Sequence, residues 1–376
     1  MREVTTYKLS RLLTIKNGKD YKHLATGSVP VFGSGGYMCS VDQYLYDKPS
    51  ILLPRKGTLT NIQYYDKPFW TVDTCFYSIV NEDIAVPYYL FWYLKMLDLS
   101  GLDSGASIPS MTIRTYNSIK VTLPPLPTQR RIASILSTYD SLIENNTRRI
   151  RLLEQMAENL YKEWFVRFRF PGHETCKMVD GIPEGWRVSR VKDYGRVETG
   201  KTPSMEKPEY YGGDIPFVKT PDMRETTFVT KTEEYLSELG NNTQKKKLLP
   251  AKSIMVSCIG SGGVVAINSV PSHTNQQINS IILDDVCDLE WLYQVCRSLK
   301  PTIELFGATG ATMTNLSKGK FERLKIIEPP KKIRAEYHQR TEGIFAEILS
   351  LQSQNASLAR QRDLLLPRLM SGKIEV

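Results

Sequence analysis

The sequence has few of the residue patterns that carry enzymatic or metal chemistry. It holds four histidines, and none belongs to an HExxH motif or stands beside a CxxC pair, so a zinc centre or a Ser-His site has little material. It also lacks the paired acidic residues with a spaced lysine of a metal-dependent nuclease, and the Asn-Pro-Pro-aromatic motif that holds an adenine amino group. We therefore expect no catalytic residue and no metal site in this chain.

Regularly spaced cysteines and long apolar runs are missing too. The six cysteines form no CxxC pair, so we interpret them as small buried hydrophobes in a reducing compartment. The N-terminal segment MREVTTYKLSRL has no apolar signal core, and no apolar run approaches the roughly 18 residues that a membrane span needs. These absences predict a cytoplasmic protein with no membrane partner.

Positive charge is in excess. The 376 residues include 49 Lys+Arg against 40 Asp+Glu, which gives a net charge of +9 and a pI near 9.1. A chain of this length is expected to form two or three domains, each with its own core. The charge favours a polyanionic partner such as nucleic acid, although many basic proteins bind none.

An internal repeat dominates the sequence. The segment SGASIPSMTIRTYNSIKVTLPPL (104–126) returns as TGATMTNLSKGKFERLKIIEPPK (309–331), with Gly105 and Gly310, like Pro124 and Pro329, 205 residues apart. A repeat this long does not fit solenoids, whose units span about 20 to 50 residues, so it predicts two homologous lobes in one chain. Such a chain is suited to a partner with two similar halves.

The two lobes share an order of predicted elements. Residues 50–65 and 71–80 are typical of strands bounded by Gly and Pro, and residues 88–97 of a short buried helix. The same order returns at residues 253–283 and 289–299. We predict one shared fold with different loops.

Each repeat runs into a heptad pattern, which predicts a long helix with an apolar seam. Apolar residues advance in alternating steps of four and three, and Pro367 is expected to disturb the last turn of the second helix. Each helix spans about 40 residues, or about 60 Å, and must bury its seam against another helix, most simply the other copy in antiparallel. The predicted coiled-coil interface contains Ile132, Leu136, Tyr139, Ile143, Asn146, Ile150, Leu153, Ile344, Ile348, Leu351, Asn355 and Leu358.

Asn146 and Asn355 are polar residues within these seams. A buried asparagine can fix the register of a coiled coil at some cost in stability. The two would meet only if the pseudo-twofold axis passed near position 148. The alternative, which we favour, is that each meets water or a partner subunit.

Two glycine-containing motifs resemble nucleotide-binding loops. Residues 195–202, GRVETGKT, fit the GxxxxGK[ST] phosphate-loop pattern, but a turn-rich segment beginning Pro203-Ser204 follows where a helix is required. We interpret the motif as the loop that closes the first strand of the lobe. The clusters at 33–36 and 260–263 are turns, or loops that let a ligand approach the backbone.

The candidate DNA contacts lie in loops beside predicted strands. Base edges are read best by Arg, Lys, Asn and Gln, whereas Ser, Thr and backbone amides hold phosphates. Residues 54–58 and 275–277 occupy related places in the two lobes, although each alone is typical of a solvated loop. Arginines 148, 149 and 151 are interpreted as a solvated helix face, with phosphate contact the less favoured alternative. The predicted DNA-binding residues are Gly35, Arg55, Lys56, Thr58, Asn61, Lys219, Ser257, Ser261, Asn275, Gln276 and Gln277.

Residues 123–173 resemble the central conserved region of the specificity subunits of type I restriction-modification systems. The resemblance rests on a proline pair before QRRI, on LEQMA and on LYKEWF. The closing LLLPRLMSGKIEV (364–376) resembles the distal conserved region of that family. IPEGWRVSRVKDYGRVETGKTPS (182–204) and YYGGDIPFVKTPDM (210–223) resemble the opening of a target recognition domain, whereas the first lobe opens less typically.

The resemblance implies a mixed α/β protein with two pseudo-repeated target recognition domains, 1–122 and 173–327. The central and distal regions, 123–172 and 328–376, would form an antiparallel two-helix coiled coil with internal pseudo-twofold symmetry. Each domain would read one half of a bipartite, asymmetric double-stranded DNA target. The helices would set the spacer between the two halves.

The resemblance also implies a non-catalytic subunit with enzymatic partners. Two methylation subunits would dock on the helices and methylate adenine N6, and restriction subunits would add ATP-driven translocation and cleavage. S-adenosylmethionine, ATP and Mg would be bound by those partners and no cofactor by this chain. The alternatives are a stand-alone nuclease or methyltransferase, and a coiled-coil scaffold without DNA function.

Overall fold

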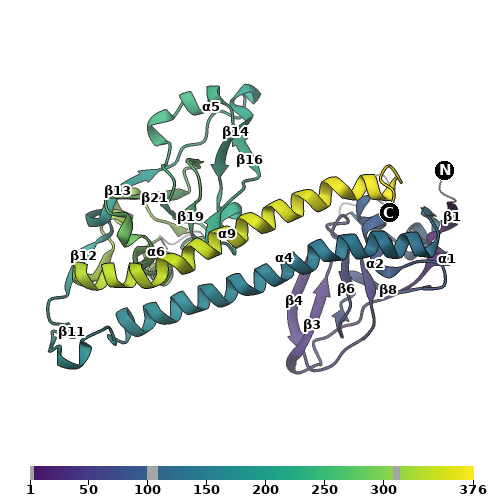
Figure 1. The fold of residues 1–376 in the computed structure, drawn as a ribbon, viewed down its shortest axis with the longest axis horizontal. Helices are drawn as coiled ribbons and strands as arrows, with labels where there is room; N and C mark the ends of the chain where they lie inside the picture. Colours follow the sequence, from purple (N-terminus) through teal and green to yellow (C-terminus); the bar gives the residue numbers. More distant parts are fainter. Residues whose placement is uncertain (1–3, 100–108, 308–313) are drawn as a thin grey trace. The chain divides into compact units, whose positions relative to one another are not determined.

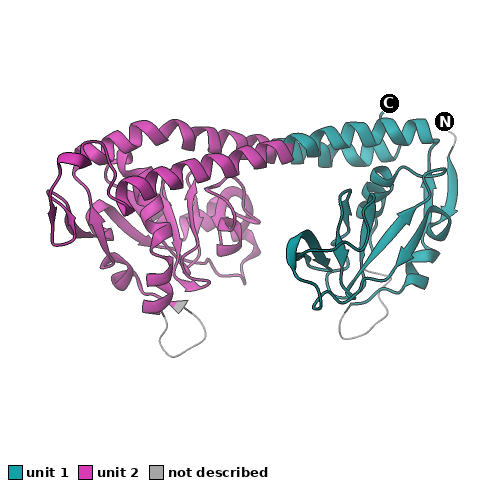
Figure 2. Ribbon diagram, turned by 90° about the horizontal axis from the view of Figure 1, so that it is seen from below, with its two compact units in different colours: residues 1–142, 358–376 teal, residues 143–357 magenta. Residues whose placement is uncertain are grey.

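The structure, a computed structural model, describes residues 4–99, 109–307 and 314–376 and divides into two compact units. Unit 1 comprises residues 1–142 and 358–376, and unit 2 comprises residues 143–357 (Figure 2). The beginnings of the two repeat copies, residues 104–108 and 309–313, lie outside the described residues.

Unit 1 contains two main sheets, and the fully buried strand β5 lies inside the first of them, between β8 and β6. The first sheet has the order β2-β8-β5-β6 and the second the order β4-β3-β7, in which β3 and β7 are parallel. The strands are β2 (Leu13–Lys16), β3 (Thr26–Gly33), β4 (Gly36–Val41), β5 (Ser50–Pro54), β6 (Gln63–Tyr65), β7 (Trp70–Thr71) and β8 (Cys75–Val80). The remaining elements are β1 (Thr5–Lys8), paired with β9 (Lys120–Leu123), and the helices α1 (Leu9–Leu12), α2 (Pro87–Met96) and α3 (Ile113–Ser118).

Unit 2 repeats this plan. The order β13-β21-β17 matches β2-β8-β5, the order β16-β14-β20 matches β4-β3-β7, and β12-β23 matches β1-β9. The strands are β12 (Arg187–Arg190), β13 (Gly195–Thr199), β14 (Tyr211–Val218), β15 (Phe228–Val229), β16 (Glu234–Leu236), β17 (Ile254–Ser257), β19 (Val265–Asn268), β20 (His273–Thr274), β21 (Ile278–Leu283) and β23 (Lys325–Glu328). The predicted duplication of one mixed α/β fold is therefore confirmed.

Short elements complete unit 2. Helix α6 (Leu289–Ser298) follows β21 as α2 follows β8. The others are β10 (Met178–Val179), β11 (Ile182–Pro183), β18 (Ile259–Gly260), β22 (Thr314–Asn315), α5 (Glu238–Asn242), α7 (Lys300–Gly307), α8 (Lys318–Glu322), and the short turns η3 (His173–Thr175), η4 (Val191–Tyr194), η5 (Pro208–Tyr210), η6 (Thr220–Met223), η7 (Lys245–Lys247) and η8 (Val286–Asp288). Two connections differ between the units: residues 219–233, from β14 to β16, replace the short turn 34–35, and residues 237–253, from β16 to β17, are about twice as long as their counterpart, residues 42–49.

The heptad patterns form the helices α4 (Leu126–Tyr161), extended by the π-helical turn η2 (Lys162–Val166), and α9 (Lys331–Met370) (Figure 1). In unit 2 they run antiparallel: the Tyr337 hydroxyl donates to the Ala157 carbonyl at 3.1 Å, and Arg149 pairs with Glu347 at 2.6 Å. In unit 1, Arg362 of α9 pairs with Asp140 of α4. The antiparallel pairing is as predicted.

All twelve side chains of the predicted seam are buried or half-buried. Asn355 does not use its amide on Asn146; it donates to the Thr147 hydroxyl at 3.3 Å and to the Ile143 carbonyl at 3.5 Å. Asn146 is itself 7% exposed. The amide nitrogen of this seam residue of α9 is therefore satisfied by the neighbouring turn of α4, whereas its side-chain oxygen is buried without a hydrogen-bond partner among the described residues.

The expectation that Pro367 disturbs the last turn of the second helix was wrong. Helix α9 continues through it to Met370. Leu366 and Leu369, on either side of the proline, are buried in the core of unit 1, and the Ser371 N–H donates to the Pro367 carbonyl at 3.0 Å. Burial of the flanking leucines outweighs the loss of one backbone hydrogen bond.

Candidate nucleic-acid interface

In unit 1 the predicted contact residues come from two loops that touch. The Asn61 amide donates to the Ser34 carbonyl at 2.8 Å, which ties the loop after β5 to the turn between β3 and β4. A Cβ atom placed on Gly57 would lie 3.5 Å from the Ser34 hydroxyl, whereas one on Gly35 would have nothing within 4 Å. The structure thus gathers the predicted residues at 35 and 55–61, and leaves the backbone at Gly35 open to approach.

The side chains in this cluster differ in what they can reach. Lys56 and Thr58 are exposed. Arg55 is half-buried, since its guanidinium donates to the Asp73 carbonyl at 3.3 Å and lies 5.8 Å from the centre of the Phe76 ring. Asn61 donates one of its amide hydrogens to the Ser34 carbonyl. Lys56 and Thr58 are therefore the side chains most available to a ligand of unit 1.

In unit 2 the predicted Asn-Gln-Gln run connects β20 to β21. Asn275 is buried, and it accepts the Gln277 N–H at 3.1 Å and donates to the Gln277 side chain at 3.2 Å. Gln276 between them is exposed, and its side-chain oxygen accepts from the Thr202 hydroxyl at 2.5 Å. Asn275 and Gln277 hold the turn, and Gln276 is presented outward.

Two further predicted residues of unit 2 have internal partners. Ser257 is fully buried, donates to the Ser261 carbonyl at 2.5 Å and accepts the Val264 N–H at 2.9 Å. A hydroxyl with no exposed surface cannot touch DNA, so we reassign Ser257 from DNA contact to closing the loop after β17. Lys219 is half-buried and paired with Glu234.

Ser261 lies at the exposed tip of that loop. Its hydroxyl accepts from Arg224 at 3.3 Å. Gly260 and Gly263 flank it with φ angles of +79° and +77°, which L side chains rarely adopt. The second glycine cluster is therefore a tight turn that presents Ser261, one of the two interpretations that the sequence left open.

The phosphate-loop motif is explained by a chain crossing. A Cβ on Gly200 would lie 2.2 Å from the Thr274 carbonyl oxygen, and the Lys201 N–H donates to that oxygen at 3.0 Å. In unit 1, a Cβ on Gly18 would lie 2.6 Å from the equivalent Thr71 carbonyl, to which the Lys19 N–H donates at 2.8 Å. The glycine is needed because two backbones cross. It closes β13, as Gly18 closes β2; the motif closes a strand as predicted, but that strand is not the first of its lobe, because β12 and β1 come before it.

A pair of equivalent residues, Gln129 and Arg334, anchors each lobe to its long helix, and neither was among the predicted site residues. In unit 1, the buried Gln129 amide donates to the carbonyls of Pro124 at 2.8 Å and Ile84 at 3.0 Å and accepts the Val86 N–H at 2.9 Å. Arg334, 205 residues later, donates to the Pro329 carbonyl at 3.3 Å. Aligning the two repeat copies at their spacing of 205 residues places Gln129 opposite Arg334, and that was the signal in the sequence for this pair.

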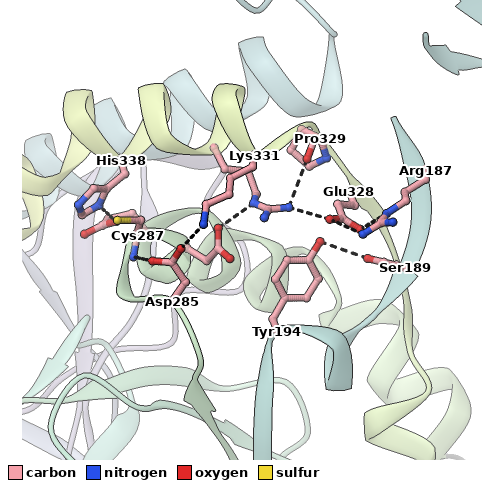
Figure 3. A network of polar contacts seen from close by, with 12 residues as sticks. Arg187, Ser189, Tyr194, Asp285, Cys287, Glu328, Pro329, Lys331 and His338 are labelled. Carbon is pink, nitrogen blue, oxygen red and sulfur yellow. Dashed lines mark hydrogen bonds and ion pairs between the residues drawn. The ribbon is translucent and has the colours of Figure 1, made fainter. Parts of the chain in front are cut away.

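A larger polar network at the start of α9 contains Arg187, Glu328 and Lys331 (Figure 3), and Arg334 belongs to it through its ion pairs. Arg334 is 8% exposed, pairs with Asp288 at 2.7 Å and Glu328 at 2.9 Å, and lies 5.2 Å from the centre of the Tyr194 ring. Arg187 also pairs with Glu328, at 2.6 Å. The Arg334 guanidinium therefore ties β23, η8 and α9 together, and the Arg187 guanidinium joins β12 to them through Glu328.

The pKa values in this network follow burial and pairing. Burial raises the pKa of Asp288 above its ordinary value, even with Arg334 beside it. Burial also disfavours ionisation of Glu328, but hydrogen bonds from Arg187 and Arg334 leave its pKa below the ordinary value. The hydrogen bond from Lys331 lowers the pKa of Asp285 to about 2. Each of these carboxyl groups faces a cation, as structural ion pairs do.

Neither a metal-ligand cluster nor a membrane-spanning helix occurs within the described ranges. Residues 4–99, 109–307 and 314–376 contain no cluster of three His, Cys, Asp or Glu side chains able to hold a metal ion. No helix in those ranges is long and apolar enough to cross a membrane. The six cysteines are unpaired; Cys75, Cys258 and Cys296 are buried as expected, whereas the other three are half-buried.

A duplicated α/β lobe with exposed Lys, Thr and Gln loops, in which each copy packs on a segment of paired long helices, defines a two-lobed recognition protein. Residues 1–155 and 183–357 match the type I restriction modification DNA specificity domain, and the chain belongs to this family of type I restriction enzyme specificity subunits. It is the non-catalytic DNA-recognition subunit of a restriction-modification system, and the catalytic activities lie in other subunits.

Relatives and a solved structure are similar over most of their lengths. The chain is 35% identical over 364 residues to the HindI specificity subunit of Haemophilus influenzae, covering 78% of this chain and 79% of the relative. It is 27% identical to the MjaIX specificity subunit of Methanocaldococcus jannaschii, with 95% and 84% covered. The crystal structure of the type I S subunit from M. genitalium shares the fold, with a TM-score of 0.63 at 14% identity and 98% and 96% coverage.

Proposed function

We propose that each lobe reads one half of a bipartite, asymmetric DNA target, unit 1 through Lys56 and Thr58 and unit 2 through Gln276. The observation that carries the proposal is that one scaffold, used twice, presents different side chains on its loops. Lysine and glutamine hydrogen-bond to base edges in the major groove, and threonine holds phosphates or contacts bases. Different loops on a repeated scaffold therefore fit a target whose halves differ.

The test uses the complete complex in cells and methylation-aware sequencing of the genome. Replacing residues 55–58 by the loop of a relative should change one half of the modified sequence, and Gln276→Ala should relax the other half. Lys120→Ala, which removes an exposed lysine from β9, is the matched control and should leave both halves unchanged. Simultaneous loss of both halves in either variant would refute separate reading by the two units.

The proposal includes the enzymatic partners of the chain. Two methylation subunits dock on the long helices and use S-adenosylmethionine to methylate adenine N6, and restriction subunits add ATP- and Mg-dependent translocation and cleavage, all in the cytoplasm. In support, Leu152 and Met156 on α4 are 56% and 57% exposed, one helical turn apart. Apolar side chains paired in this way on a long helix suit contact with another protein.

The docking face is tested by a pull-down of the methylation subunits. Leu152→Glu together with Met156→Glu should weaken the complex, because two charges would replace the apolar contact. Arg148→Glu with Arg151→Glu, on exposed positions of the same helix, is the control for charge alone. Equal loss in both double variants would show that the apolar pair is not the docking site.

The helices are proposed to set the spacer between the half-sites. Inserting four residues near Asn146 and four near Asn355 adds about 6 Å to each helix and rotates the seam by only about 40°. The spacer in the methylated sequence should lengthen, and both half-sites should stay the same. A four-residue insertion at Gly181, in the β10–β11 turn, is the control. Altered half-sites with an unchanged spacer would contradict the proposal.

A further inference from the structure

The long connection from β16 to β17 is an ordered addition to unit 2. Its helix α5 lies beside β14 and β16 (Figure 1), and Ser237 caps the helix by accepting the Gly240 N–H at 3.2 Å. Asn241 is buried, and its side-chain oxygen accepts from His273 at 2.9 Å. Burial lowers the pKa of His273 to about 4, so the imidazole is neutral and donates through Nε2. The segment is therefore held in one place by its own contacts.

This segment carries three consecutive lysines over a groove. Residues 242–247 and Lys201 line a groove of about 720 Å³, and none of these residues is acidic. Lys247 is half-buried; its ammonium group pairs with Glu198 at 2.8 Å and donates to the Thr199 carbonyl at 2.7 Å. Lys201, Lys245 and Lys246 are exposed, and in the described part of the chain no carboxylate forms an ion pair with them. The groove therefore carries three positive charges, on Lys201, Lys245 and Lys246, that are not balanced by an ion pair among the described residues.

A buried amide in the same wall lacks partners. Gln244 is 5% exposed, and neither its amide nitrogen nor its amide oxygen has a hydrogen-bond partner within the described residues. Native proteins rarely leave such a group unsatisfied, so a buried water is expected beside it. The amide atoms themselves have no exposed surface, so contact with an oxyanion in the groove falls to the three exposed lysines, Lys201, Lys245 and Lys246.

The groove adjoins the loop that we propose to read DNA. Lys201 precedes Thr202, whose hydroxyl donates to Gln276, so the groove and the reading loop share one edge. The connection in unit 1, residues 42–49, has no lysine run; its one lysine is Lys48. Unit 2 thus has a basic surface that the duplicated scaffold does not supply by itself.

We infer that Lys201, Lys245 and Lys246 bind phosphates of the DNA backbone beside the half-site read by unit 2. The inference rests on the proposed function and adds a second, sequence-independent contact to it. Phosphate contacts fix the position of a protein on the duplex and carry no base information. Unit 2 then contributes more of the salt-dependent affinity than unit 1.

The test compares Lys245→Ala/Lys246→Ala with Lys192→Ala/Lys325→Ala, which removes the same charge from exposed lysines on η4 and β23 outside the groove. Duplex affinity of the full-length chain in its complex is measured against KCl, with target and scrambled DNA. Losing two phosphate contacts should reduce the slope of log K on log salt by about 1.8. Raising KCl from about 50 to about 200 mM should then weaken wild-type binding about 12-fold more than variant binding.

Each outcome separates this inference from its alternatives. The ratio of target to scrambled affinity should stay constant in the groove variant; a changed ratio would mean base contact and would overturn the phosphate assignment. An equal change of slope in the control would show a general charge effect. ATP or inorganic phosphate at millimolar concentration should not protect Lys201 or Lys245 from acetylation, and protection by either would make the groove a small-molecule site. An unchanged slope of log K on log salt with intact target binding would refute only this inference, whereas absence of any duplex binding would refute the proposed function.

Discussion

Arg334 offers the sharpest test of how unit 2 is held on its helix. Replacing it by Gln, the residue at the equivalent position 129, keeps a group able to donate to the Pro329 carbonyl but removes the charge. Two carboxylates, Asp288 at 2.7 Å and Glu328 at 2.9 Å, would lose their shared cation in a site where Arg334 is 8% exposed. Removing one partner of a buried ion pair costs about 3 to 5 kcal/mol, so we expect Arg334→Gln to lower the free energy of unfolding by that amount.

The pH dependence of this loss has a defined sign. Without Arg334, the pKa of Asp288 in the folded state should rise further above its unfolded value of about 3.9, and the pKa of Glu328, which now lies below its ordinary value, should rise through its unfolded value of about 4.3. A folded state that binds more protons than the unfolded state gains stability as pH falls. The deficit of the variant should therefore be largest near neutral pH and shrink as pH falls through the raised pKa values.

The assay is urea unfolding with amide hydrogen exchange of α6, which reports on unit 2 alone. Gln129→Ala is the matched control in unit 1; it leaves neutral groups without partners and should cost about 1 to 3 kcal/mol without this pH dependence. A deficit below about 1 kcal/mol for Arg334→Gln, or one that grows as pH falls, would refute the assignment of Arg334 as the charged anchor.

Three further predictions concern stability. Gly200→Ala should lower the free energy of unfolding by at least about 1 to 3 kcal/mol, because its Cβ would lie 2.2 Å from a carbonyl oxygen. Gly319→Ala in α8, where a Cβ would have nothing within 4 Å, should be neutral or slightly stabilising. Equal thermal unfolding temperatures for the two variants would contradict the chain crossing at Gly200. Leu351 is 1% exposed, so Leu351→Ala should lower the free energy of unfolding by about 2 to 5 kcal/mol; Leu152 is 56% exposed, so Leu152→Ala should lower it by less than about 0.5 kcal/mol. Equal urea midpoints for the two variants would mean that the seam is misplaced. Burial lowers the pKa of His273 to about 4, so the free energy of unfolding should fall by about 3 kcal/mol as pH falls from about 6.5 to 4, because the unfolded chain takes up a proton that the folded chain does not. His273→Gln should flatten this part of the profile of stability against pH, and an unchanged profile would count against a buried neutral imidazole.

The sequence by itself determined the duplication, the long helices and the family. A heptad period kept over more than four repeats has one physical solution, a helix with a buried seam, so α4 and α9 and their antiparallel pairing could be predicted from Ile132 to Leu365. Strands such as β5 and β17 were predictable because their apolar runs end at Pro or Gly signals. The same local rules identified the GKT segment as a strand-closing loop, since no helix could follow Pro203-Ser204.

Only the tertiary structure decided what each loop side chain can touch. Ser257 and Gln276 are both polar residues beside strands, yet one is buried on internal partners and the other is exposed, because loop closure and not composition sets their direction. The glycine at 200 is required by a carbonyl of a strand about 75 residues away, and Arg334 by carboxylates on separate elements. Such contacts depend on distances between segments remote in sequence, which periodicity does not encode. The basic groove of unit 2 is of the same kind, because Lys201 and Lys245 meet only when β13 and the connection after β16 are folded together.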